Sequence, residues 1–190
     1  MHGGYRRSKH PPKWGVRAAF FIRSCLLISF SINAISASQL QNAGDPVPLT
    51  RQDIILSALA AAGENALFSP VQVQKLFFLI DRKAAHLLGG PHFAFRPYDY
   101  GPFDPAVYDQ LTALGFSGHV QLSGSGRYRS YSLTPQGFVE GQRILTALPA
   151  QSAGFLKAVA QWILKLNFQQ LVSAIYREYP DMKVNSIFHG

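Results

Sequence analysis

Apolar side chains after residue 50 recur at steps of three and four, the spacing that places them on one face of an α-helix. The first such stretch begins at Thr50, with Asp53 at the capping-box position, and runs to Gly63. The second opens with Ser69-Pro70, an N-cap followed by the proline favoured at the first helical position, and ends at Gly89. We therefore predict two helices joined by a short turn.

The second predicted helix divides clearly into an apolar and a polar side. Its apolar face is formed by Val73, Leu76, Phe77, Ile80, Ala84 and Leu87. Its opposite side carries Gln72, Lys75, Arg82 and Lys83. An amphipathic helix of this kind packs its apolar stripe on a core and leaves its polar side in water. We therefore expect the four polar side chains to be exposed.

Residues 93–103 are dense in aromatic side chains and contain two prolines. Pro97 and Pro102 each remove a backbone donor and turn the preceding residue away from helix, so a long helix is excluded. We predict an extended or short-strand segment with a turn at Tyr100-Gly-Pro. The aromatic block has two interpretations: it closes an edge of the core, which we favour, or with Arg96 it forms a partner hot spot or stacks on bases.

A third helix is predicted to start at Asp104-Pro105 and to end at Gly115, because a capping residue and a proline open it and a glycine stops it. Its inward-facing residues are Val107, Leu111 and Leu114. Residues 118–134 then predict a β-hairpin, since Ser123-Gly-Ser-Gly126 supplies a turn between two stretches of β-forming residues.

Three more helices complete the predicted order. One starts at Thr134-Pro135 and ends near Leu148, and two amphipathic ones follow, with Asn167 and Gln170 as a capping pair between them. Helices followed by a hairpin and a further helix is the order of a winged helix-turn-helix. We expect an α+β, mainly helical fold with a winged helix-turn-helix-like core, a β-hairpin and two added C-terminal helices.

The charge of the chain is unevenly distributed. The 190 residues include 18 Lys and Arg against 10 Asp and Glu, a net charge of +8. Residues 1–45 hold six of these cations against one acid, Asp45, so they account for +5 of the total. Residues 46–190 are only mildly basic, and their charge alone does not indicate a polyanionic partner. We predict a leader or disordered extension over residues 1–45 and one domain over residues 46–190.

The leader has the order of a secretory signal, with basic residues, an apolar stretch from Cys25 to Ile32 and then small residues. The apolar stretch is too short for a transmembrane helix, which needs about 20 residues. Residues 1–45 are interpreted as a signal or loose anchor, which would act through residues 1–37, as a disordered or wrongly included extension, which we favour, or as a helix packed on the domain. We expect a cytoplasmic protein, with an exported or membrane-associated one as the alternative.

The side chains that would carry chemistry do not form a recognisable catalytic or metal-binding pattern. The six histidines lack ligand spacing, and Cys25 is the only cysteine, so an internal disulfide is excluded. No Gly-x-Ser-x-Gly motif is present, and Gly124-Ser-Gly126 lacks the lysine of a phosphate-binding loop. We therefore expect a non-catalytic protein without a metal or cofactor.

Three segments carry a resemblance to a known family: Val73-Gln-Lys-Leu-Phe-Phe-Leu-Ile80, Tyr100-Gly-Pro-Phe-Asp-Pro-Ala-Val-Tyr108 and Tyr131-Ser-Leu-Thr-Pro-Gln-Gly137. Together they resemble the SocA-like, or Panacea, domain of phage-associated proteins and of antitoxins, over about residues 50–145. The resemblance implies a cytosolic protein-binding role, either neutralising a toxin or serving as an adaptor. Asp81-Arg82 departs from the family, which often continues there with aromatic or aliphatic residues.

Two classes of partner compete, DNA and protein. The third predicted helix would enter the major groove, yet it contains no basic residue and carries Asp104 and Asp109, which phosphates repel. We therefore favour a protein partner, a small toxin or a protease substrate. The candidate residues for binding it are Lys75, Arg82, Arg96, Tyr98 and Tyr100. The alternative is a winged-helix DNA-binding transcriptional regulator, with Arg127, Tyr128 and Arg129 as the candidate contacts.

Overall fold

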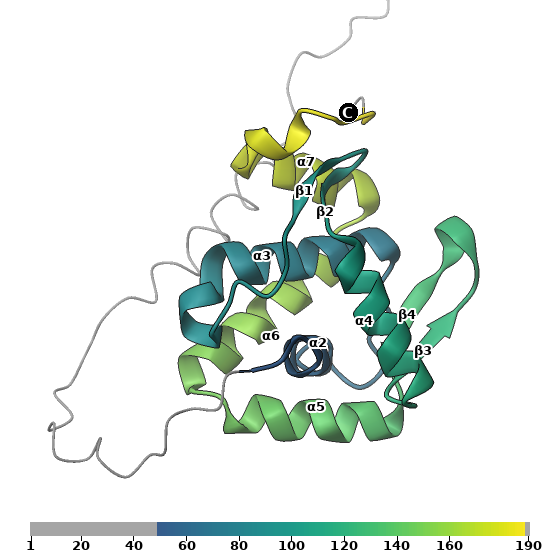
Figure 1. The fold of residues 1–190 in the computed structure, drawn as a ribbon, viewed down its shortest axis with the longest axis vertical. Coiled ribbons are helices and arrows are strands. Elements are labelled where there is room, and N and C mark those ends of the chain that lie inside the picture. The colour runs from purple at the N-terminus through teal and green to yellow at the C-terminus, as the bar shows by residue number, and fades with distance from the viewer. Residues whose placement is uncertain (1–48, 189–190) are drawn as a thin grey trace, which may run out of the picture. The chain divides into compact units, whose positions relative to one another are not determined.

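A computed structural model of the chain describes residues 49–188, and the predicted leader over residues 1–45 lies outside them. The described part contains six α-helices and two separate two-stranded antiparallel sheets (Figure 1). The expectation of a mainly helical α+β fold is therefore confirmed. Within the described residues, no helix is both long and apolar enough to span a membrane.

Helix α2 (Arg51–Ala60) lies at the centre of the helical layers, seen end-on in Figure 1 with α5 beneath it. Its predicted capping box is present, since the Asp53 N–H donates to Thr50 Oγ1 and the Thr50 N–H donates to Asp53 Oδ2. Every side chain from Ile54 to Ala60 is buried, so α2 is covered on all sides and not on one face. Buried Ser57 donates its hydroxyl to the Asp53 carbonyl at 2.7 Å, which satisfies it without a tertiary partner.

Helix α5 (Pro135–Ala147) packs closely along α2. The approach is possible because residue 141 is glycine: a Cβ there would meet the Leu56 carbonyl oxygen and would lie 2.7 Å from the Ala60 Cβ. Gln142 then donates its side-chain amide to the Ala60 carbonyl at 3.0 Å, which satisfies an acceptor at the end of α2. The two helices are joined by backbone proximity as well as by apolar side chains.

Helix α3 (Pro70–Leu88) has the predicted N-cap Ser69 with Pro70 after it and the predicted stop at Gly89, which is left-handed, and Gln72 completes a capping box with Ser69. Helix α6 (Ala150–Leu164) packs against it, and Gln72 also donates to the carbonyls of Ile163 and Leu166. The predicted apolar stripe is buried except for Leu87, which is partly exposed, and Gln74, Lys75, Phe78 and Leu79 are buried as well. Of the four polar side chains expected to be exposed, Arg82 is exposed and Gln72 and Lys83 are partly covered. The prediction that Lys75 is exposed is wrong, because a second element covers that side of α3.

The covering element is a short hairpin between α3 and α4, made of β1 (Arg96–Tyr98) and β2 (Gly101–Phe103). Tyr98 pairs with Gly101, whose φ of 98° lies in the region that glycine tolerates best. Helix α4 (Pro105–Phe116) follows at once, with Asp104 as its predicted N-cap. It runs one residue past the predicted stop at Gly115.

The second hairpin pairs β3 (Val120–Ser123) with β4 (Ser130–Leu133) and projects beside α4 (Figure 1). Its connection is longer than the predicted turn, because a 3₁₀-helix, η2 (Gly126–Tyr128), lies between the strands. Phe68, just before α3, exchanges two backbone hydrogen bonds of 2.9 Å with Tyr131 on β4. Phe68 thereby adds one extended residue to the edge of the β3–β4 sheet.

The chain returns to the first hairpin through α7 (Phe168–Glu178) and η3 (Pro180–Lys183). The predicted capping pair is present, since the Gln170 N–H donates to Asn167 Oδ1 and the Asn167 N–H donates to Gln170 Oε1. An ion pair of 3.0 Å between Lys83 and Glu178 links α3 to α7. Both α7 and η3 contact the β1–β2 hairpin, so the C-terminal part of the chain covers it.

Replacement of Phe77 by alanine should cost about 3–5 kcal/mol of unfolding free energy, the range for deletion of a large core aromatic. Phe77 is fully buried and its ring lies 5.7 Å from that of Phe93. Phe116→Ala is the matched control, because Phe116 is 90% exposed and should lose less than about 0.5 kcal/mol. Chemical denaturation of both variants measures the difference. Equal costs would contradict the packing of α3.

Candidate functional site

Two of the three segments that carry the resemblance contact each other through buried hydrogen bonds. The Gln74 side-chain amide donates to the Asp104 carbonyl at 3.0 Å and accepts from the Asp104 N–H at 3.0 Å. Lys75 Nζ donates to the Pro102 carbonyl at 3.0 Å. Adjacent residues of α3 therefore hold β2 and the start of α4 by their main chain. The pairing depends on side chains at positions 74 and 75 and on the path of the backbone at 102–104.

Lys75 is an unusual group for a core, since it is a lysine with only 3% of its surface exposed. Burial disfavours the charged ammonium and lowers its pKa from 10.5 to about 7. A Cβ at Gly101 would lie 3.5 Å from Lys75 Cε and 3.2 Å from Tyr176 Cε1. The amine thus lies directly beneath the turn of the first hairpin, and a side chain at position 101 would crowd it.

Asp104 fixes the other side of this junction. One carboxylate oxygen accepts the Ala94 N–H at 2.6 Å, and the other accepts the Ala106 N–H at 2.9 Å. The carboxylate is buried, so it does not point outward from α4 as a charge that would face phosphates. That expectation is wrong for Asp104, while Asp109 is exposed as expected.

Asp81 has a structural role. Its two carboxylate oxygens accept the backbone N–H groups of His92 (3.0 Å) and Phe93 (2.8 Å). Burial raises the pKa of this carboxyl, and the two backbone bonds oppose the shift. Arg51 donates to the His92 carbonyl at 2.6 Å from the opposite direction. The segment that leads into β1 is therefore held by the Asp81 carboxylate from α3 and the Arg51 guanidinium from α2.

The aromatic block separates into a buried and an exposed part. Phe93 is buried and packs on Phe77, which closes an edge of the core. Tyr98 and Tyr100 are 53% and 42% exposed. We call Arg96, Tyr98 and Tyr100 the aromatic turn.

The two exposed rings are nevertheless held in place. The Tyr98 ring lies 5.0 Å from that of Phe103, and the Tyr100 ring lies 5.1 Å, edge to face, from that of Phe168 at the start of α7. Arg96 is exposed at the first position of β1. The structure therefore brings three of the predicted partner-binding residues onto one hairpin.

Arg82 and Lys75 occupy different surroundings from the other three candidates. Arg82 pairs with Asp181 of η3 at 3.5 Å and lies over the Phe78 ring at 5.4 Å. Because η3 also contacts β1, Arg82 is linked to the aromatic turn through this short helix. Lys75 lies beneath the turn and reaches no surface.

The residues predicted for DNA lie at the connection between β3 and β4. Tyr128 and Arg129 are adjacent and exposed, while the side chain of Arg127 lies outside what the structure describes. The outward positions of the neighbouring α4 include Asp109, Thr112, Ala113 and Phe116. On this surface the β3–β4 hairpin carries an exposed cation, Arg129, and α4 carries none.

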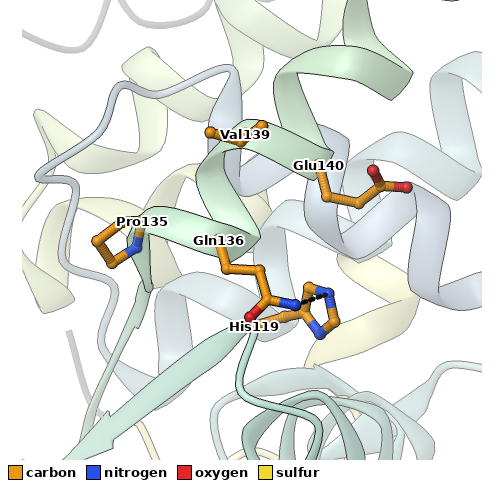
Figure 2. Close-up of a pocket in the computed structure, with 5 residues that line it drawn as sticks. All are labelled: His119, Pro135, Gln136, Val139 and Glu140. Atoms are coloured by element: carbon orange, nitrogen blue, oxygen red, sulfur yellow. Dashed lines mark hydrogen bonds between the residues drawn. The ribbon is translucent and has the colours of Figure 1, made fainter.

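Figure 2 shows a shallow depression at the start of α5, lined by His119, Pro135, Gln136, Val139 and Glu140. His119 lies within contact of Ser117 (Nδ1 to Oγ, 2.9 Å) and of Gln136 (Nε2 to Nε2, 3.4 Å). Glu140 is engaged by Arg143 through two hydrogen bonds and does not contact the imidazole. A serine, a histidine and an acid are near one another here, but without the relay of a nucleophilic triad.

The sequence left His119 isolated, but Ser117 contacts it from two residues earlier, at the end of α4, and Gln136 contacts it from the start of α5. Within residues 49–188, no three His, Cys, Asp or Glu side chains group closely enough to hold a metal ion. No protein-family model, curated protein or solved structure matches the chain.

Replacement of Lys75 by methionine should remove a rise of stability with pH. A lysine whose folded pKa is about 7 and whose unfolded pKa is about 10.4 binds more protons when unfolded between these values. Its burial penalty is therefore complete below pH 7 and is relieved as the pH rises. The unfolding free energy should gain up to about 1.4 kcal/mol per pH unit relative to Lys75→Met.

Denaturation of both proteins from pH 6 to 9.5 measures this difference, since groups common to both cancel. Parallel stability curves for the two proteins would show that Lys75 stays charged in the folded state.

Proposed function

We propose that this chain is a non-catalytic protein-interaction module of the SocA-like, or Panacea, type, acting as an antitoxin or adaptor in a toxin–antitoxin or phage-linked system. The observation that carries the proposal is the aromatic turn. Its tyrosines are exposed, yet the hairpin bearing them is fixed from below by Lys75 and by the Gln74–Asp104 pair. These buried contacts join the two segments on which the family resemblance mainly depends.

A winged-helix-like core is part of the proposal. Its support is the order α2, Phe68, α3, α4, β3, β4, in which Phe68 pairs with β4 and β4 pairs with β3. Three short extended segments beside three helices is the arrangement of a winged helix-turn-helix. The β1–β2 hairpin is then an insertion between the second and third helices. It stands where a DNA-binding member has a tight turn.

The chemistry of the aromatic turn favours a protein partner. Tyrosine and arginine are the residue types that most often dominate interface energies, because they combine apolar area with directed donors. Contacts with Phe103 and Phe168 already restrict the rings of Tyr98 and Tyr100, so less side-chain entropy is lost on binding. A small toxin or a protease substrate is a partner of suitable size for such a compact surface.

The second candidate function is sequence-specific DNA binding by a transcriptional regulator. Exposed Tyr128 and Arg129 on the β3–β4 connection favour it, since an aromatic ring beside a cation suits a nucleic-acid backbone. The sequence of α4 counts against it, because that helix contributes no Lys or Arg to neutralise phosphates. We therefore rank protein binding first.

Co-expression with the protein encoded beside this gene tests the proposal. If that protein arrests growth, this chain should restore it, and the double variant Arg96→Ala, Tyr98→Ala should lose the rescue. Loss of two hot-spot residues should weaken binding of the purified pair by at least about thirtyfold. Both residues are exposed, so circular dichroism and the melting temperature should be unchanged.

The matched control is the double variant Tyr128→Ala, Arg129→Ala, which removes the same residue types from the other hairpin. Under the proposal it rescues growth as the unaltered chain does. A mobility shift on the gene's upstream region, steeply dependent on salt and lost only in this control variant, would instead establish DNA binding. The two variants therefore give opposite results under the two functions.

A further inference from the structure

Residues 185–188 lie against the first hairpin. The Ile187 N–H donates to the Asp99 carbonyl at 3.0 Å, and Asn185 Nδ2 donates to the Pro97 carbonyl at 3.2 Å. Asp99 belongs to the turn of the hairpin and Asn185 to the turn after η3, so the contact consists of one main-chain and one side-chain bond and is not a strand pairing. The segment therefore uses main-chain acceptors that another peptide with suitable donors could reach.

A hydroxyl provides the second element of recognition. Ser186 Oγ donates to the Asp99 carbonyl at 3.2 Å and accepts the Tyr176 hydroxyl at 2.6 Å. The same oxygen accepts the Phe188 N–H at 3.0 Å. Three groups converge on this one atom, so a residue without a side-chain hydroxyl would leave the Tyr176 hydroxyl without this acceptor and the Asp99 carbonyl with the Ile187 N–H alone.

An aromatic ring provides the third element. The Phe188 ring lies 5.9 Å from that of Phe168 and 6.2 Å from that of Tyr176. Phe168 also contacts Tyr100, so the place taken by Phe188 is continuous with the aromatic turn. Phe188, two residues after Ser186, therefore packs its ring against the rings of Phe168 and Tyr176 on α7.

Residues 184–188 contact the hairpin but bury little of their surface. Ile187, between the two anchors, is 54% exposed, and Val184 before them is also exposed. Apart from Ser186 and Phe188, which are partly covered, the segment contributes little to the core. Elements with few buried apolar contacts open at low cost, so this segment can leave its position while the helices stay folded.

We propose that this edge is a peptide-binding site that the chain's own residues 185–188 occupy, and that a partner displaces them. The partner segment is a peptide carrying a serine or threonine followed two residues later by an aromatic residue. A main-chain N–H bound by the Asp99 carbonyl contributes to its affinity, and the hydroxyl and the ring supply its specificity. The biological use of the site rests on the proposed protein-binding function, whereas its existence is a property of the chain alone.

The test uses a fluorescent peptide with the sequence of residues 183–188 and the full chain. In the double variant Ser186→Ala, Phe188→Ala, the chain's own segment loses its hydroxyl and ring contacts and competes less well, so the peptide should bind at least tenfold more tightly than to the unaltered chain. A peptide with alanine in place of its serine should bind the variant at least tenfold more weakly. Tyr176→Phe in the variant background should weaken the intact peptide while retaining the ring, with circular dichroism confirming the fold.

Equal peptide affinity for the unaltered chain and the double variant would overturn the proposal, as would equal binding of the two peptides. Concentration-dependent dimers of the unaltered chain that the peptide cannot dissociate would also overturn it, because the occupant would then be a second copy. Growth rescue does not depend on the peptide measurement. Rescue that persists while peptide binding fails rejects this site alone, and peptide binding without rescue rejects the antitoxin role alone.

Discussion

The hydrogen-bonded pair between the Gln74 side chain and the Asp104 main chain is the constraint on which the rest of the described structure depends. A buried amide without partners costs more than a formed hydrogen bond returns, so α3 is compatible only with a chain path that brings residue 104 to it. Once Asp104 is there, its carboxylate fixes the start of α4 and the approach through Ala94. These bonds fix the two ends of the β1–β2 hairpin. The residues at its tip make none of these bonds and can differ without breaking them.

Lys75 adds to this constraint, but burying its charge costs free energy that an apolar side chain would not cost. Its ammonium donates to Pro102 from a site where burial lowers its pKa to about 7, so folding works against the charge near neutral pH. A methionine could fill the same volume without this penalty. What the lysine adds is direction, since it holds one carbonyl of β2 and keeps Gly101 and its turn close to α3 and α7. The rigid display of Tyr98 and Tyr100 follows from that placement.

Most helices could be predicted from the sequence because their signals are local. Thr50 with Asp53, Ser69 with Gln72 and Asn167 with Gln170 are capping pairs three residues apart, and all three are present. The burial of Lys75 and Asp104 could not be predicted in this way, because it depends on a hairpin about 25 residues further along folding back onto α3. A periodic pattern assigns a polar residue to water unless another element covers it. The position of residues 185–188 was missed for a related reason, since main-chain carbonyls leave no pattern in the sequence.

The placement of the first hairpin also explains why charge is a poor guide to the function of this chain. In a winged-helix DNA reader the affinity comes from cations on the third helix and the wing together. Here α4 presents Asp109, Ala113 and Phe116, and the exposed cation of the wing region stands on the hairpin alone. The groups with directed chemistry are instead the exposed tyrosines of the aromatic turn and the carbonyls of Pro97 and Asp99, which residues 185–187 engage. All of them belong to the β1–β2 hairpin between α3 and α4, so under the proposed function this hairpin is the surface that would distinguish one partner from another.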